Sequence, residues 1–354
     1  MNLRDAVEME ILADSLASNK IWGNKWSSKY ILEQLVSKMQ GIKIIGLPSA
    51  KLSIDLLNQE HDEFDEEVTV HLPITNLMME IHQLQIGAVT FHRSSSEYRK
   101  KITGLATEVH QNMSPVAKET FKLEDATEVI LRPMRFETSA SFVTVAEPIL
   151  GIERALTEVR RTLEILTLAC SYRFPDKMEG DIQLSIFGEI PHKGPSITYQ
   201  FGEGLYASQE SYPSSAPMNI VPESLQAFDR HGITDLFELL QKPLHRLNDI
   251  ESALLRSIHW FAVSQGQLEL ENRLLNLTTA IESLLTVGEQ YSITSRISEG
   301  SAVLLMSDYD SFVSTRDFMQ QIYKARSNVS HGGHRVTTLH EIHRLRNIAT
   351  ELIM

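Results

Sequence analysis

Cysteine is almost absent from the chain, and Cys170 is the only one. A single cysteine cannot form an intrachain disulfide, so a small scaffold held by disulfides is excluded. No apolar run approaches the roughly 20 residues that a membrane-spanning helix needs. The stretch from Met1 to Glu10 carries acids and lacks the basic-then-apolar layout of a signal peptide. We therefore expect a cytoplasmic protein that does not contact a membrane.

Several common catalytic motifs are also missing. The sequence contains no G-x-x-x-x-G-K-[ST] loop, no H-E-x-x-H, no G-x-S-x-G and no paired C-x-x-C. The chemistry of a phosphate-cradling loop, of a zinc protease and of a serine hydrolase therefore has no support, and we expect no cofactor.

Positive charge is scarce, because 33 Lys and Arg face 46 Asp and Glu, for a net charge of −13. A protein with this balance repels nucleic acid as a whole, so a role on nucleic acid requires a local basic island. One such island lies between Tyr323 and Met354. Its cations outnumber its two acids, Glu341 and Glu351, and they are Lys324, Arg326, Arg335, Arg344 and Arg346.

The length of 354 residues suggests about two domains. Short runs rich in β-branched residues predict strands at 68–72, 86–91, 129–134 and 141–145. The apolar spacing of 148–172 predicts a long helix, and the runs 182–187 and 196–201 flank a turn that predicts a hairpin. We therefore predict an N-terminal mixed α/β domain with a small sheet over 1–215, followed by a Ser- and Pro-rich linker within 208–217.

After Pro222 the pattern changes to helical spacing throughout. The clearest case has apolar residues at alternating intervals of four and three, namely Leu270, Leu274, Leu277, Ile281 and Leu284. Short loops between such helices favour an antiparallel bundle. We predict an all-α C-terminal domain over 222–354, and an α+β protein overall.

Arg326 is the most unusual residue of this region. On a helical wheel it falls in the middle of an apolar stripe that contains Met319, Ile322 and Val329. Burying an unpaired charge costs several kcal/mol, so the guanidinium requires an anion. That anion is either an internal carboxylate such as Glu282, as a structural partner, or the phosphate of a substrate, which a planar fork of donors suits. Residue chemistry alone favours Glu282.

His331 follows Arg326 by five residues, about 140° further round an ideal helix. Gly332 and Gly333 come next and should end the helix through a left-handed C-cap. Two interpretations stay open. The imidazole either favours the C-terminal end of the helix dipole, or turns toward a functional site where the helix unwinds. Spacing alone favours the dipole.

Histidine pairs three residues apart can ligate a transition metal. Two such pairs occur, formed by His331 with His334 and by His340 with His343. No cysteine or acid completes an obvious set of four ligands, so we expect no metal site.

The segment around Arg326 resembles the HEPN superfamily, and specifically the ApeA-like HEPN group of bacterial proteins. The family mark is an arginine, then a histidine after four to six residues near a helix end, then glycine. Here it reads Tyr323-Lys-Ala-Arg326-Ser-Asn-Val-Ser-His331-Gly332. Upstream, 274–285 looks like the helix that leads the HEPN domain of this group. The resemblance covers about residues 245–354.

This resemblance implies a helical bundle that homodimerises and brings two such segments into one cleft. Many HEPN proteins are metal-independent endoribonucleases in phage (antiviral) defence or toxin–antitoxin systems. Carried onto this chain, His331 would handle protons at the RNA 2′-hydroxyl or the leaving oxygen, and Arg326 would stabilise the charge on the phosphate. Ser327 or Asn328 would orient the pair. The neighbouring residues implied to bind RNA are Lys324, His334 and Arg335.

A second class of function follows from the same resemblance. Some HEPN domains bind RNA, nucleotides or partner proteins without cleaving, and the net charge of −13 fits weak or gated access of RNA. The chain also departs from the family at Ser327, where Asn, His or Asp is usual. We predict a HEPN-type endoribonuclease that acts by acid–base chemistry, with the non-catalytic binding module as the alternative.

Overall fold

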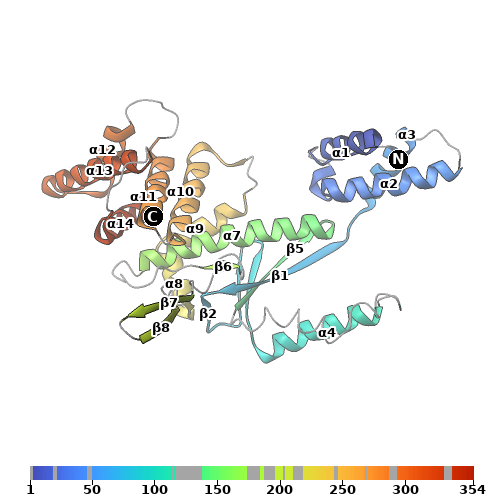
Figure 1. Ribbon diagram of the computed structural model, residues 1–354, viewed down its shortest axis with the longest axis horizontal. Coiled ribbons are helices and arrows are strands. Elements are labelled where there is room, and N and C mark those ends of the chain that lie inside the picture. The colour runs from blue at the N-terminus through green and yellow to red at the C-terminus, as the bar shows by residue number, and fades with distance from the viewer. Residues whose placement is uncertain are drawn as a thin grey trace. The chain divides into compact units, whose positions relative to one another are not determined.

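The structure is a computed structural model. It describes residues 3–18, 22–45, 50–112, 115, 118, 138–173, 184–186, 196–201, 204–209, 218–242, 246–267, 269–286, 293–330 and 337–354. The chain forms two compact units, of which the first comprises Met1–His71 and Ser141–Val159 and the second Leu72–Ala140 and Arg160–Met354. Figure 1 labels the elements of both, and helices predominate over strands.

The first unit is built on helices that bury tryptophans. These helices are α1 (Leu3–Ala17), the short 3-10 helix η1 (Trp22–Asn24), α2 (Ser28–Ile45) and α3 (Ala50–Glu63). Trp22 and Trp26 are buried together, and the imidazole of His61 stacks on Trp22 with ring centroids 5.7 Å apart. Each tryptophan buries a large area, and the two form this core together with Ala13, Ile31, Leu35 and Leu57.

The long helix predicted over 148–172 is α7, Pro148–Arg173. Its start follows from Pro148, which suits the first helical position because it lacks an N–H that would otherwise need a partner. The buried carboxylate of Glu147 accepts hydrogen bonds from the amides of Ile149 and Leu150, each at 2.8 Å. These bonds satisfy free amides of the first turn and place a negative charge at the positive end of the helix.

The main sheet has five strands in the order β3-β4-β5-β1-β6. The strands are β1 (Glu67–Thr75), β3 (Gln83–Ile86), β4 (Val89–Arg93), β5 (Thr138–Val145) and β6 (Ser185–Ile186). The predicted strands 68–72 and 141–145 lie in β1 and β5, whereas 129–134 falls outside the described residues.

The single strand predicted over 86–91 is wrong. Ile86 and Val89 face each other across an antiparallel pair, so the chain reverses between them. Gly87 adopts a φ of 59°, which glycine reaches without the steric cost that a side chain brings. The turn consists of Gly87 and Ala88. Neither residue is polar, so the sequence pattern does not distinguish this turn from the strands on either side.

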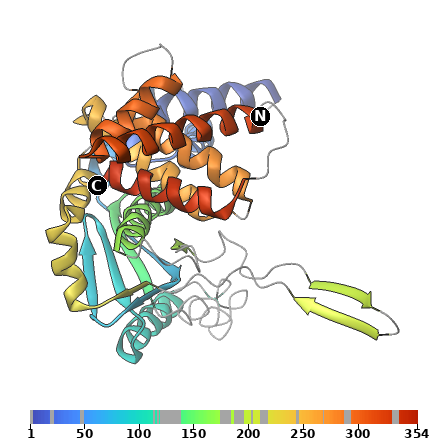
Figure 2. The ribbon, with the colours of Figure 1, turned by 90° about the vertical axis from the view of Figure 1, so that its left-hand side faces the viewer.

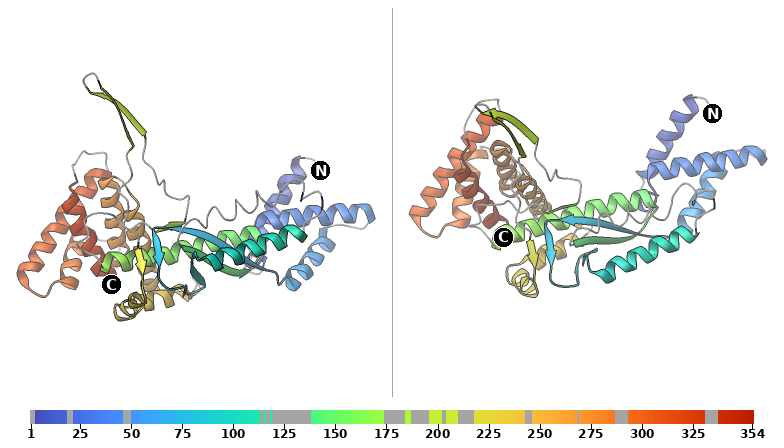
Figure 3. Two further views of the ribbon diagram at one scale, coloured as in Figure 1. Left: turned by 90° about the horizontal axis from the view of Figure 1, so that it is seen from below. Right: turned by 60° about the horizontal axis from the view of Figure 1, so that its bottom comes forward.

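The hairpin predicted between 182–187 and 196–201 is also wrong. β6 pairs with β1 through Ile74 and Ile186. β7 (Ser196–Phe201) pairs instead with β8 (Gly204–Gln209), and together they form a two-stranded ribbon that Figure 3 shows. Two-residue loops are the commonest hairpin connections, and only two residues of the sequence separate β7 from β8. The start of the predicted linker lies in β8, and 210–217 falls outside the described residues.

Two further strands, β2 (Leu77–Met79) and β9 (Met218–Ile220), pair in parallel. The other helices are α4 (Ser96–Asn112), α8 (Pro222–Arg230), α9 (Ile233–Leu240), α10 (Asp249–Gln265), α11 (Leu270–Leu285), α12 (Ile293–Leu305), α13 (Tyr309–Ser330) and α14 (Leu339–Ile353). No strand occurs among the described residues after Pro222, and the α+β layout is confirmed. None of the described helices is long and apolar enough to cross a membrane.

The helices from α10 to α14 lie together in a bundle, as Figure 2 shows. At its centre, α11 packs against α10, α12, α13 and α14. Its side chains Leu274, Leu277 and Ile281 are almost completely buried. The same regular spacing leaves Glu282 at the edge of this buried stripe, facing α13.

Candidate functional site

Arg326 lies on α13, about one helical turn before that helix ends at Ser330. Met319, Ile322 and Tyr323 are buried on the inner face of the helix. The Arg326 side chain is 33% exposed. The residue therefore lies at the border of the apolar stripe, with about one-third of its side chain accessible.

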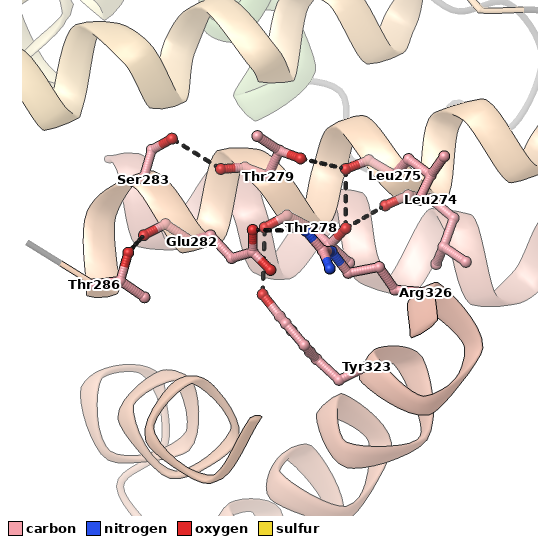
Figure 4. A network of polar contacts seen from close by, with 9 residues as sticks. All are labelled: Leu274, Leu275, Thr278, Thr279, Glu282, Ser283, Thr286, Tyr323 and Arg326. Carbon is pink, nitrogen blue, oxygen red and sulfur yellow. Dashed lines mark hydrogen bonds and ion pairs between the residues drawn. The ribbon is translucent and has the colours of Figure 1, made fainter. Parts of the chain in front are cut away.

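The guanidinium of Arg326 pairs with Glu282, the carboxylate named from the sequence. Arg326 Nη2 donates to Glu282 Oε2 at 3.0 Å, and the Glu282 side chain is only 19% exposed (Figure 4). Arg326 Nε is buried and has no hydrogen-bond acceptor within the part of the chain that the structure describes. The Nη2 group of Arg326 is therefore held by Glu282 on α11, while its Nε–H group has no acceptor among the described residues.

Burial decides the electrostatics of this cluster. Desolvation raises the pKa of Glu282. The positive charge of Arg326 lowers this pKa, and so do the hydrogen bonds that Glu282 receives from Tyr323 and Arg326. The Tyr323 hydroxyl donates to the carbonyl oxygen of Thr278 at 3.3 Å. Burial, followed by the charge of Glu282, raises the pKa of Tyr323 far above its usual value. Tyr323 is thus a permanently protonated donor beside the ion pair.

Four hydroxyl groups lie within about one helical turn of Glu282 along α11 and its C-cap (Figure 4). Each donates its hydrogen to a backbone carbonyl of its own helix at 2.7–2.9 Å, and the residues are Thr278, Thr279, Ser283 and Thr286. Because these hydrogens are occupied, the hydroxyl oxygens can only accept further hydrogen bonds.

A polar cleft of about 640 Å³ lies between α10 and α11, and no residue of α13 is among the described residues that line it. Its walls include Glu282 and, from α10, Asp249, Ser252 and Arg256. Sequence reasoning missed this cleft. The signal was present, because Thr279, Glu282, Ser283 and Thr286 recur at helical intervals of three and four, which marks a polar stripe on one face.

The remaining residues predicted for the site divide into two groups. Lys324, Ser327 and Asn328 are exposed on α13, close to Arg326 in sequence. The other predicted site residues, His331, His334 and Arg335, fall outside the described residues.

The second histidine pair, His340 and His343, lies on α14. Among the residues with described positions, no group of three or more His, Cys, Asp or Glu could hold a metal ion.

Comparisons with protein-family models, with curated proteins and with solved structures gave no match.

Proposed function

We propose that the protein is a metal-independent endoribonuclease of the HEPN type, acting in the cytoplasm in phage defence or a toxin–antitoxin stress response. In this proposal Arg326 and His331 act on an RNA phosphodiester. The observation that supports it best is the state of Arg326, which is anchored on one nitrogen by Glu282 and one-third exposed at the end of α13.

Arg326 is suited to stabilise charge on a phosphate. A guanidinium carries five N–H donors in a fixed plane, so a carboxylate on one edge leaves donors for phosphate oxygens on another. Glu282 orients the group before substrate arrives, and a donor held in position costs no reorganisation when charge develops. The exposed side chains of Lys324, Ser327 and Asn328 offer further contacts to RNA.

His331 would supply the proton transfers, since the imidazole pKa lies near neutrality. A base removes the proton of the ribose 2′-hydroxyl, and the 2′-oxygen attacks phosphorus. The bond from phosphorus to the 5′-oxygen then breaks, and an acid protonates that oxygen. The products are a 2′,3′-cyclic phosphate and a 5′-hydroxyl. Base and acid come from two histidines when two subunits contribute to one cleft.

A surface suited to a second copy lies where α12 meets α13. Val303, Leu304 and Tyr309 are 66%, 65% and 77% exposed there. Neighbouring exposed apolar side chains mark a protein-binding surface more often than isolated ones do. This observation supports the proposed homodimer through the helical domain. Replacing Val303 and Leu304 by Glu should give a monomer in light scattering, whereas Ile152→Glu, at an exposed apolar site on α7, should not.

The direct test is cleavage of end-labelled single-stranded RNA by the purified protein in EDTA. His331→Ala should lower the rate by roughly 10² to 10⁴-fold, the usual contribution of a general acid or base. The matched control is His340→Ala, which removes an exposed histidine from the next helix. Cleavage at the parental rate by His331→Ala would sink the catalytic assignment. Loss of activity in EDTA that a divalent metal restores would replace the acid–base mechanism.

The non-catalytic binding module remains the second candidate, for a specific reason. Glu282 already provides Arg326 with a counter-ion, so the pair is stable without substrate. The net charge of −13 also weakens the attraction of RNA. RNA binding that Arg326→Ala abolishes, with no cleavage by the parental protein, would favour this candidate.

A further inference from the structure

A cavity of about 500 Å³ lies within the second unit, away from the site around Arg326. Three parts of the chain line it: the C-terminal end of α7, the junction of α8 with α9, and the C-terminal end of α14. These elements can be followed in Figure 1 by their labels. Neither Arg326 nor Glu282 contributes to its wall, so it is a separate site.

The wall of the cavity is largely apolar and aromatic. The lining residues Ala169, Phe228 and Ile233 are buried. The rings of Tyr172 and His231 meet edge to face, with centroids 5.1 Å apart and an angle of 64°. Ligand pockets in proteins have this size and composition, with a few polar groups that select the ligand. Such a wall suits a flat ring.

Four of the lining residues offer hydrogen-bond acceptors to the cavity, namely Asn347, Glu351, Thr350 and Ser171. Asn347 and Glu351 are one helical turn apart on the same face of α14. The hydroxyls of Thr350 and Ser171 donate to the carbonyls of Arg346 and Thr167, so only their lone pairs remain.

The charge of the lining also restricts the ligand. Among the described residues that line the cavity, one is a carboxylate and none is Lys or Arg. Phosphate and other anions are therefore disfavoured, and a neutral ligand that donates hydrogen bonds is favoured.

We propose that this cavity binds a nucleobase that carries an exocyclic amino group, with adenine as the best fit. A side-chain amide such as that of Asn347 pairs with the amino group and ring nitrogen of adenine, and a carboxylate such as Glu351 accepts from a base amino group. The aromatic wall stacks on the ring. Uracil and hypoxanthine carry a carbonyl in place of that amino group, so they leave Glu351 facing another acceptor.

The base would contact the last turn of α14, and α14 packs against α11, the helix that carries Glu282. The cavity is thus connected through one helix to the bundle centre. Its assignment does not depend on RNA cleavage, because binding is measured directly.

The test is calorimetric titration of the full chain with adenosine, cytidine, uridine and inosine. Adenosine should bind about tenfold more tightly than inosine, since one well-formed contact to a base edge discriminates by about that factor or more. Glu351→Gln should narrow this ratio, because a glutamine amide can also donate to a carbonyl. Ala227→Trp should fill the cavity and abolish binding, and Asn347→Leu should weaken adenosine binding without filling it.

Glu108→Gln is the matched control, because it removes an exposed carboxylate on α4 that does not line the cavity. Its affinity for adenosine should equal that of the parental protein, and circular dichroism should confirm that all variants fold. Equal affinity for adenosine and uridine, adenosine binding that both Ala227→Trp and Asn347→Leu retain, or no binding of any nucleoside at millimolar concentration would overturn the proposal.

A short oligoadenylate distinguishes the two sources of the base. Binding of the oligomer with the same sensitivity to Glu351→Gln would assign the cavity to a base within RNA. Binding of adenosine alone would assign it to a free nucleoside. Either result supports the proposed chemistry of the cavity.

Discussion

Two arginines on helix α13 form ion pairs of nearly equal length in different surroundings. Arg316 Nη2 lies 2.8 Å from the carboxylate of its neighbour Asp317, and Arg326 Nη2 lies 3.0 Å from Glu282. The arginines are equally exposed, at 34% and 33%, but Asp317 is 50% exposed and Glu282 only 19%. The distance between the charges therefore does not distinguish the pairs, whereas the burial of the acid does.

The pKa shifts follow the same division. The hydrogen bond with Asp317, and then its charge, raise the pKa of Arg316, as expected for a solvated pair. At the other site burial raises the pKa of Glu282, against the opposing effect of Arg326. Around Arg326 the fold keeps a carboxylate where water solvates it poorly. That arrangement is explained by a role for Arg326 in the bundle, in substrate binding, or in both.

The largest effect expected in the folded protein is that of Arg326→Ala. Removing a partner from a fully buried pair costs roughly 3 to 5 kcal/mol, and an exposed pair contributes less than about 1 kcal/mol. For this partly buried pair we expect a loss of about 2 kcal/mol in the free energy of unfolding. Arg316→Ala should leave the urea midpoint unchanged. Equal urea midpoints for the two variants would show that burial of the carboxylate does not make the Arg326 pair more important for stability than the Arg316 pair.

The same comparison predicts a dependence on pH. Without Arg326, the already raised pKa of Glu282 should rise further. A raised pKa in the folded state means that folding favours the protonated acid, so stability is lost as pH rises above the ordinary glutamate range. The deficit of Arg326→Ala should therefore be smaller near pH 4 than at pH 7, by about 1 kcal/mol. Urea titrations at both values measure it, and a deficit independent of pH would exclude Glu282 as the cause.

Tyr323→Phe should have a smaller effect. The variant removes the hydroxyl that donates to the Thr278 carbonyl and that lowers the pKa of Glu282. The Thr278 carbonyl keeps its bond within α11, so losing this additional hydrogen bond should cost no more than about 1 kcal/mol. Ser330→Ala is the matched control, because it removes an exposed hydroxyl from the same helix. Thermal melts that shift equally for both variants would contradict the prediction.

The smallest effect is expected at a third ion pair, between His259 on α10 and Glu164 on α7. The atoms lie 2.7 Å apart, and His259 is 49% exposed. The hydrogen bond with Glu164 raises the pKa of His259. A histidine whose pKa is raised by folding stabilises the protein at pH values below its ordinary pKa. This stabilisation is lost as the pH rises through the pKa of the histidine in the folded protein. Because solvent screens this ion pair, Glu164→Gln should lower the free energy of unfolding by less than about 1 kcal/mol at pH 6.

At pH 9 the cost of Glu164→Gln should vanish, because the imidazole is then neutral. Glu153→Gln, at an exposed site of the same helix, is the control and should show no such difference. A loss of stability that persists at pH 9 would show that the charge on His259 is irrelevant.

The sequence alone determined where the helices of the bundle lie and which of their faces are buried. The apolar spacing from Leu270 to Leu284 predicted a helix there, and the structure has α11 at Leu270–Leu285. Glu282 could be named as a partner because helical spacing placed Arg326 within an apolar stripe, where its charge requires an anion. The structure moves Arg326 to the border of that stripe but keeps the pair. Helical periodicity contains this information because each residue advances the helix by a constant angle.

Strand partners and sites shared between distant segments were decided only by the tertiary structure. A pattern of alternating residues marks a strand without naming its neighbour, so β6 and β7 were predicted to pair with each other rather than with β1 and β8. The cavity depends in the same way on Tyr172, His231 and Glu351, which come from three separate segments. Periodicity shows which face of a helix is buried, but only packing in three dimensions decides what covers that face and what space remains.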